Sequence, residues 1–394
     1  MRRSLVRIAL AAFLASGCGG ADKPVKQPKV SKTKKKDTSA LMAQARDNAK
    51  SGDVDEADRA YSEAYDMNHD FDVLEERVDF LIHVGRAAKA EEVSKVYYDA
   101  NSTDPRGYSI YADALIAGYK ADKALDVAES LIALDDKKSW GHEKRGRALI
   151  LMDRLDEAID ELKKATGMEA ENWRAHLALG QALQKQKNNA AAQLELQAAL
   201  KYEPDDPEVN AYLGAALRDL GELDRAKEFL DKALKFDQRN GRAWFELGLL
   251  YNVQKKQADA EIALANSVRF SPNESLFWYA YGEIFRLQDR TDDALKAYRR
   301  AVDLDPPYPK AIGKLVQVLV DRKEYDEAER LLTQAVRRDP KNAMNYLALG
   351  TVYQAKKKTK AAIESFQKYL DLAPKNDPDR NKAKEAIDAL KRRG

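Results

Sequence analysis

The sequence predicts an all-helical chain built from stacked helical hairpins. From residue 71 onward it repeats every 34 residues without an insertion, and each unit holds two apolar-periodic segments separated by a short turn. Six units have glycine at position eight and ten units have alanine at position twenty, so two helices can cross closely in each hairpin. The chain has only 12 prolines and little clustering of β-branched residues. One hairpin cannot bury its own apolar face, so we expect the hairpins to stack into an array.

The N-terminal residues have the pattern of an export signal. A basic segment over residues 1–7 precedes a short apolar segment over residues 8–15, which is too short to span a bilayer. The five residues that end at Cys18, LASGC, resemble the lipobox of bacterial lipoproteins, whose cysteine is diacylated and becomes the first residue of the mature chain. We therefore predict a signal peptide over residues 1–17 and lipid attachment at Cys18. The alternative is an ordinary cleaved signal peptide with an incidental cysteine.

Residues 18–37 are predicted to be an extended tether after the lipidated cysteine. They contain two prolines, many lysines and almost no apolar side chains. The lysines either contact anionic lipid beside the anchor or form a solvated spacer, and the sequence leaves both possibilities open. Without the signal peptide and residues 18–36 the formal charge falls from +2 to about −7, which disfavours nucleic-acid binding.

The repeats resemble the tetratricopeptide repeat (TPR) over residues 38–376. Proline at position 32 ends the second helix in five units, and a large residue at position four, leucine at seven and a large apolar residue at eleven complete the pattern. The resemblance implies a superhelical solenoid of about ten hairpins. Its units start near residues 38, 71, 105, 139, 173, 207, 241, 275, 309 and 343.

Residues 377–394 are predicted to form a capping helix. Apolar residues share one face of this segment and charged residues cover the rest of it, as expected for a helix that closes the last repeat. The apolar residues are Ala383, Ala386, Ile387 and Leu390. Tether, array and cap account for every residue after Cys18, so no segment remains for a catalytic domain.

The residue types that catalysis or metal binding requires are scarce. Cys18 is the only cysteine, and none of the four histidines has partners at metal-ligand spacing. No glycine-rich phosphate loop follows a strand, and the acidic pairs fall at expected turns and helix starts, where they are typical helix caps. We therefore expect no enzyme activity, no cofactor, no metal and no small-molecule substrate.

A partner would then bind on the concave surface, which the TPR resemblance assigns to the first helix of each hairpin. Positions 2, 5, 9 and 12 share one helical face. The candidate partner-binding residues are Trp140, Arg218, Arg242, Phe245, Leu249, Leu276, Tyr279, Glu283 and Arg286. The aromatic and apolar members either contact a ligand or pack between neighbouring first helices.

Two further features describe the concave surface. Earlier units present acidic residues there, so a long partner would be read by charge along the groove. These residues are Asp72, Glu75, Asp79 and Asp113. Trp244 and Trp278, at position four, are predicted to belong to the core.

These features predict a protein-binding scaffold or assembly factor, lipid-anchored in a bacterial cell envelope and facing the periplasm. Gly19 after the cysteine favours the outer membrane by family analogy. By resemblance to repeat-bearing bacterial lipoproteins, including pilotins, the partner is a peptide or protein of an envelope machine such as a pilus or secretion system. The alternative is a non-catalytic regulatory subunit that positions a peptidoglycan or polysaccharide enzyme.

Overall fold

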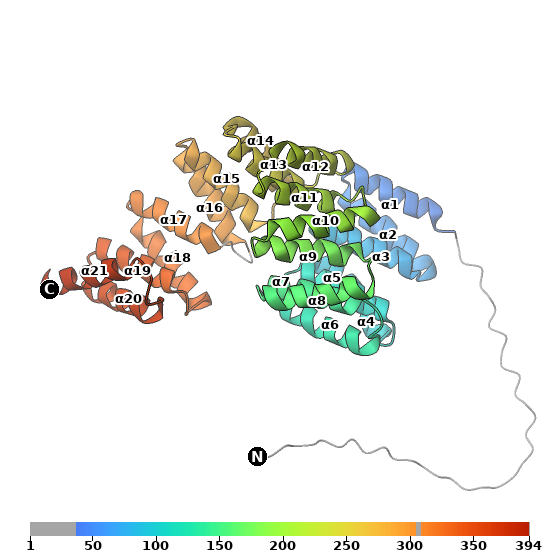
Figure 1. Cartoon of the computed structure of the whole chain (residues 1–394), viewed down its shortest axis with the longest axis horizontal. Helices are drawn as coiled ribbons and strands as arrows, with labels where there is room; N and C mark the ends of the chain where they lie inside the picture. The colour runs from blue at the N-terminus through green and yellow to red at the C-terminus, as the bar shows by residue number, and fades with distance from the viewer. Residues whose placement is uncertain (1–36, 305–308, 394) are drawn as a thin grey trace, which may run out of the picture.

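The computed structural model describes residues 37–304 and 309–393, and within these ranges the chain is helical and has no strand (Figure 1). The predicted signal peptide, Cys18 and all of the predicted tether except residue 37 lie outside the described residues. The first helices of the hairpins are α1 (Ser39–Ser51), α3 (Phe71–His83), α5 (Pro105–Ala117), α7 (Trp140–Leu151), α9 (Trp173–Lys185), α11 (Pro207–Asp219), α13 (Gly241–Val253), α15 (Ser275–Leu287), α17 (Pro309–Asp321) and α19 (Ala343–Ala355). The second helices are α2 (Val54–Asn68), α4 (Ala87–Ala100), α6 (Ala121–Leu134), α8 (Leu155–Met168), α10 (Asn189–Tyr202), α12 (Leu223–Phe236), α14 (Gln257–Phe270), α16 (Thr291–Asp303), α18 (Tyr325–Arg338) and α20 (Thr359–Leu372), and α21 (Arg380–Arg393) ends the chain. The predicted fold class, an all-helical superhelical solenoid, is confirmed.

Each hairpin starts and turns by local chemistry that the sequence encodes. At the start of α11, the Asp206 carboxylate accepts a hydrogen bond from the Val209 N–H at 2.8 Å, and Pro207 occupies the first helical position. After α11 the chain reverses through Gly221, which has φ +84°, and the Glu222 N–H donates to the Leu217 carbonyl at 2.9 Å. The left-handed residue of this turn recurs in every hairpin. The residues are Gly52, Gly85, Tyr119, Asp153, Lys187, Gly221, Lys255, Asp289, Lys323 and Lys357.

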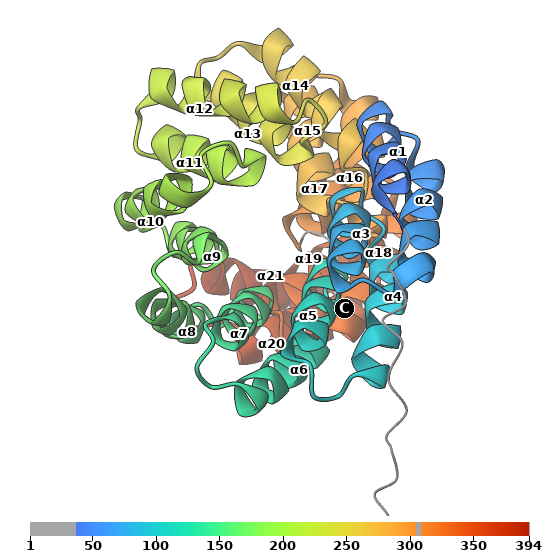
Figure 2. The same cartoon turned by 90° about the vertical axis from the view of Figure 1, so that its right-hand side faces the viewer.

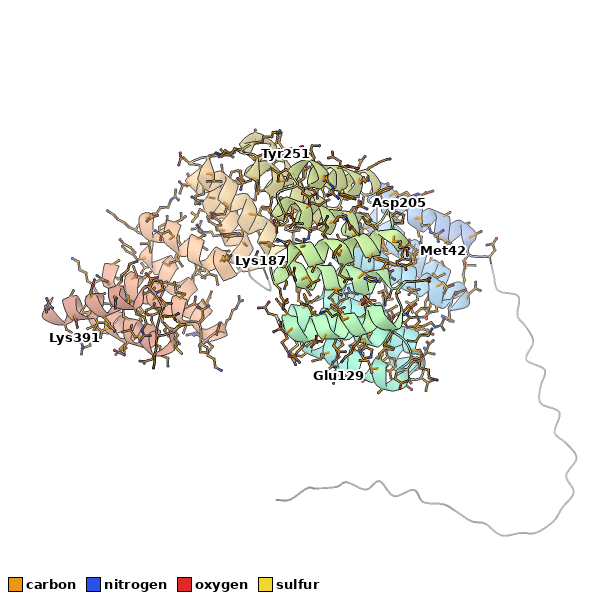
Figure 3. All side chains as sticks on the ribbon, viewed as in Figure 1. Met42, Glu129, Lys187, Asp205, Tyr251 and Lys391 are labelled. Carbon is orange, nitrogen blue, oxygen red and sulfur yellow. The ribbon has the colours of Figure 1, made fainter. Side chains whose placement is uncertain are left out.

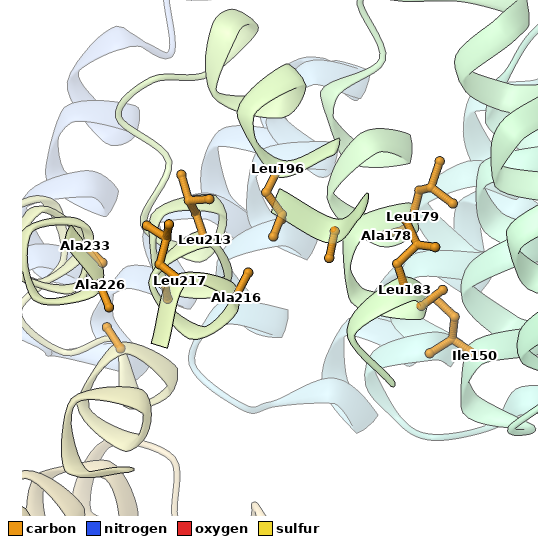
Figure 4. Packing of buried hydrophobic residues seen from close by; sticks show 14 of the residues in the cluster. Ile150, Ala178, Leu179, Leu183, Leu196, Leu213, Ala216, Leu217, Ala226 and Ala233 are labelled. Carbon is orange, nitrogen blue, oxygen red and sulfur yellow. The ribbon is translucent and has the colours of Figure 1, made fainter. Parts of the chain in front are cut away.

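The core lies between the first and second helices and runs along the array (Figure 4). The position-eight glycines face a large side chain sixteen residues later. A Cβ on Gly214 would lie 2.7 Å from Cγ of Leu230, so an alanine there needs a shift of the neighbouring helix. The position-twenty alanines, such as Ala226, are fully or almost fully buried. The small residues therefore permit the close helix crossing that the sequence predicts.

Residues at position four fasten the loop that precedes each hairpin. The indole N–H of Trp244 donates to the Gln238 carbonyl at 2.9 Å, and that of Trp278 donates to the Pro272 carbonyl at 2.8 Å. In each case the acceptor lies six residues earlier in the chain. Both rings are half-buried and pack against the core, so each tryptophan contributes packing and a loop anchor together.

Helix α21 covers the end of the last repeat. Its residues Ala383, Ile387 and Leu390 are buried against Phe366 and Tyr369 of α20. The side chains fill the space between the helices, and Lys391 marks the free end of this part of the chain (Figure 3). None of the helices in the described ranges combines the length and apolar character that a membrane span requires.

The array has two parts with different shapes. Helices α1 to α15 wind round until the turns of the first three hairpins lie beside α12 to α15 (Figure 2), and we call residues 38–287 the ring. Helices α17 to α21 extend away from it (Figure 1), and we call residues 309–393 the arm. Helix α16 packs against both α15 and α17 and joins the two parts.

Candidate functional site

The concave side of the ring encloses two neighbouring cavities. The larger, which we call the central cavity, has a volume of about 500 Å³ and is lined by residues of α3, α9, α11, α13 and α15 and of the loops that precede α13 and α15. The second cavity has a volume of about 340 Å³ and lies between α3, α5, α7 and α9. Trp173 and Arg174 at the start of α9 line both cavities. The central cavity is therefore of a size that suits a drug-sized molecule or a few residues of an extended peptide.

Arginines stacked on aromatic rings dominate the central cavity. The Arg242 guanidinium lies 5.1 Å from the ring centroids of both Tyr212 and Phe277. Arg174 lies 4.7 Å from the Trp173 ring. These cation–π contacts hold each guanidinium group against the aromatic side chains of the cavity.

Carboxylates offset these cations. Burial, together with the nearby Asp113 carboxylate, raises the pKa of Asp79 to about 6. Burial also raises the pKa values of Asp206 and Glu208. Arg174 Nη2 lies 3.6 Å from Asp79 Oδ2 across the ring interior, which is a long ion pair. The cavity thus contains both signs of charge, and the pKa values of Asp79, Asp206 and Glu208 are raised above their usual values.

A buried charge cluster separates the two cavities. Asp113 lies 2.8 Å from Lys144 Nζ and 2.5 Å from Arg147 Nη1, and Glu143 lies 2.7 Å from Lys144 and 3.0 Å from Arg147. Glu143 and Lys144 are almost fully buried. The predicted acidic surface is therefore neutralised around Asp113, whereas Asp72 and Glu75 stay exposed and the Asp79 side chain is half-exposed.

Trp140, Arg218, Arg242 and Phe245 all lie in the ring, in different environments. Trp140 lines the second cavity and is half-buried. Arg218 pairs with Glu246 and with Asp219, so its guanidinium group is already engaged by two carboxylates of the protein itself. Phe245 is 3% exposed and stacks on Phe277 with 4.4 Å between ring centroids. For Phe245 the structure therefore shows the packing role, and almost none of its surface is accessible to a partner.

The remaining candidates lie near the junction of ring and arm. Leu249 and Leu276 are half-buried and pack against the cluster around Phe277. The Tyr279 ring is half-buried and lies 6.0 Å from that of Tyr298. Glu283 accepts a hydrogen bond from the Tyr298 hydroxyl and pairs with exposed Arg286 at 3.1 Å. Burial raises the Glu283 pKa, but its hydrogen bonds and charged neighbours outweigh burial and leave that pKa below its usual value.

A more accessible concave surface begins at these residues and continues along the arm. We call it the arm surface and define it as positions 2, 5, 9 and 12 of α15 and α17 together with the first two such positions of α19. Its residues are Leu276, Tyr279, Glu283, Arg286, Lys310, Gly313, Gln317, Val320, Met344 and Leu347. Position five shows how accessibility differs between α11 or α13 and α17. Ala211 and Phe245 are buried, whereas Gly313 is exposed. A Cβ at residue 313 would meet no atom within 4 Å. Met344 is 52% exposed.

Several cavity residues lie outside the predicted set. Arg174 occupies position two of its unit, the same position that selected Arg242, and Trp173 precedes it. Applying the same positions to that unit would have found Arg174. Tyr119, His83 and Glu274 lie in turns or loops or at a helix end, outside the helix face on which the prediction was based. The described residues contain no cluster of three or more side chains suited to a metal ion.

Sequence families match most of the array. The family described as the cytochrome c-type biogenesis protein H TPR domain matches residues 261–380. General tetratricopeptide repeat families match residues 42–105, 149–217 and 221–275. The predicted repeat is therefore confirmed by sequence similarity over these ranges. No curated protein sequence matches the chain significantly.

Solved structures share the fold at low sequence identity. The Cut9–Hcn1 hetero-tetramer of the APC/C aligns with a TM-score of 0.55 and 17% identity over 85% of this chain, which spans 59% of the matched chain. Yeast Tom70 aligns with a TM-score of 0.52 and 15% identity, covering 90% of this chain and 96% of its own. A human IFIT1 dimer with m7Gppp-AAAA aligns with a TM-score of 0.51 and 16% identity, covering 83% and 88%. The chain is thus a TPR superhelical solenoid, a fold used as a protein-interaction scaffold.

Proposed function

We propose that this chain is a membrane-tethered scaffold that holds a polypeptide partner on the arm surface while an envelope machine is assembled or maintained. In this proposal Cys18 carries the lipid, residues 19–37 give reach, and the protein has no catalytic activity of its own. The resemblance of residues 261–380 to the TPR domain of a cytochrome c-type biogenesis protein supports the proposal, because this range includes the whole arm surface. It favours a task in the biogenesis of another protein.

The observation that carries the proposal is the contrast between the ring and the arm. In the ring, contacts between first helices and across the interior occupy much of the concave side, as the buried pair Phe245 and Phe277 illustrates. On the arm, Lys310, Gly313 and Gln317 of α17 are exposed at concave positions. A partner therefore has room to dock on the arm without displacing the protein's own side chains.

The arm surface also indicates the chemistry of the partner segment. Its apolar side chains include Leu276, Tyr279 and Met344, and Arg286 and Lys310 lie among them. Glu283 is already engaged by Tyr298 and Arg286. Apolar contacts beside cations favour a segment with apolar side chains flanked by acidic ones.

Site-specific photocrosslinking in cells tests this function. A photoreactive phenylalanine at Gly313 has space around its Cβ, and the same probe at Ile262, which is 61% exposed on α14, serves as the control. We expect a discrete crosslinked partner at residue 313 that is absent at residue 262. Met344→Glu places an acidic charge on the arm surface and should reduce the crosslink several-fold, whereas Leu194→Glu on α10, 67% exposed, should not.

Two results would contradict the proposal. One is a crosslinking pattern that is the same at residues 313 and 262. The other is an unchanged crosslink at residue 313 in the Met344→Glu variant, because a partner seated on the arm surface must sense a charge placed there.

A further inference from the structure

Three hairpins at the start of the ring touch two loops that lie far along the chain. The Tyr119 hydroxyl in the third turn donates to Glu274 Oε1 at 2.9 Å, and His83 Nε2 at the end of α3 lies 3.3 Å from Asp237 Oδ2. In the first turn, Gly52 packs so closely on the Arg239 guanidinium that a Cβ at residue 52 would collide with it. Asp237 and Arg239 lie in the loop before α13, and Glu274 lies in the loop before α15. The contacts therefore connect hairpins one to three with hairpins six to eight.

The residues in these contacts are not required by the hairpins that carry them. The left-handed turn position is glycine, lysine or aspartate in the other hairpins and an aromatic residue only at Tyr119, which has φ +56°. A bulky side chain in this conformation is strained. The turn itself does not require tyrosine, because glycine occupies the same position at Gly85 and Gly221. At residue 119 the tyrosine instead brings its phenol into contact with Glu274.

The contacts are polar and partly exposed, so they hold the ring with little free energy. Tyr119 is 44% exposed and the His83 side chain is 57% exposed. Bonds of this kind are individually weak compared with the buried core of each hairpin. The hairpins can therefore keep their fold when these contacts break.

Closure also completes the central cavity. Asp79, His83 and Tyr119 line it from the early hairpins, whereas Arg239, Arg242 and Glu274 line it from the later ones. The two sets approach each other only because the ring is closed. Separation of the contacts would move the two walls apart, so occupancy of the cavity and closure of the ring are linked.

We propose that the contacts of Tyr119 with Glu274, His83 with Asp237 and Gly52 with Arg239 form a clasp that lets the ring open and close as a unit. The closed state is the one with a formed central cavity. Opening exposes the concave side of the early hairpins without unfolding them.

Distance measurement between two spin labels tests the clasp in the full chain with Cys18→Ser as background. Labels at Asp47→Cys on α1 and Lys235→Cys on α12, both exposed, report on separation across the clasp. Labels at Asp160→Cys and Glu228→Cys, also exposed, span hairpins on one side of it and serve as the control pair. The clasp is opened with Tyr119→Gly plus His83→Ala. Lys187→Gly relieves the same backbone strain in a turn away from the clasp and is the matched variant.

In the double variant we expect the ratio of open to closed ring to rise roughly fivefold for each of the two polar interactions that the substitutions remove. This appears as a longer component in the Asp47–Lys235 distances, with the control pair unchanged and Lys187→Gly like wild type. Wild-type distances in a double variant of native helicity would overturn the proposal. If that variant loses helicity, the Tyr119→Phe variant, which lacks only the hydroxyl, provides the test by amide hydrogen exchange. A roughly fivefold loss of exchange protection at residues 271–275 supports the clasp, and unchanged protection there overturns it.

Discussion

The hydroxyl of Tyr119 donates to the carboxylate of Glu274, 155 residues further along the chain. In a plain solenoid each repeat contacts only its neighbours, and folding energy is a sum of such local terms. This bond and the pair of His83 with Asp237 add non-local terms. The stability of the early hairpins is therefore coupled to that of the loops before α13 and α15.

A core mutation in the second hairpin should loosen a loop four hairpins away. Leu81→Ala removes a fully buried side chain from α3, two residues before His83, and should cost about 2–5 kcal/mol. We expect faster hydrogen exchange at residues 237–240 as well as in the second hairpin. Leu319→Ala is the matched control, since Leu319 is equally buried at the same repeat position in α17. Equal exchange at residues 237–240 in both variants would contradict the coupling.

Two glycine-to-alanine substitutions should change stability in opposite directions. In Gly214→Ala the new Cβ would lie 2.7 Å from Leu230 and 3.1 Å from the Ala226 carbonyl, so we expect destabilisation by about 1–3 kcal/mol. In Gly313→Ala the Cβ meets nothing within 4 Å, and the helix propensity of alanine should stabilise α17 by up to about 1 kcal/mol. Urea unfolding midpoints measure both effects. Stabilisation of both variants would show that helix propensity, not packing, decides.

Asp79 should make stability fall as pH rises from about 4 to about 6. Burial raises its pKa to about 6 in the folded chain, so the folded state holds the proton more tightly than the unfolded state in this window. Asp79→Asn removes this term and should be more stable than wild type above pH 6, by less than about 1 kcal/mol because the side chain is half-exposed. The two proteins should converge near pH 4. Parallel pH profiles of the unfolding midpoint would show that Asp79 titrates normally.

Replacement of Cys18 by serine should release the protein from membranes. In the proposed function, lipid attachment at Cys18 supplies the anchor, and no helix in the described ranges is suited to span a bilayer. Fractionation of bacteria that express the chain measures the effect. Ser16→Ala keeps the cysteine and a small residue before it, and should remain in the membrane fraction. Retention of the Cys18→Ser variant in membranes would contradict the lipid anchor.

The repeat and its register were predictable because each depends on neighbours within one unit. The glycine and alanine positions indicate where two helices cross, and the proline position indicates where a helix ends, all within one 34-residue unit. The helices follow this register, since α11 begins at Pro207 and α13 at Gly241. Ring closure depends on the small rotation between successive hairpins, summed over many of them. No local pattern reveals that sum. The meeting of Tyr119 with Glu274 was therefore not predictable, and the pattern left open whether Phe245 packs or binds.

The clasp would change how the array bears mechanical load. A pull on the chain before Asp37 acts first on the α1–α2 hairpin, which is the end of the stack and would be the first to peel away. Because the clasp also links the first three hairpins to the loops before α13 and α15, part of the tension passes directly to those loops. With the N-terminus fixed to a membrane as proposed, the ring bears the load at two points, and force on the anchor is shared between opposite sides of the ring before any hairpin unravels.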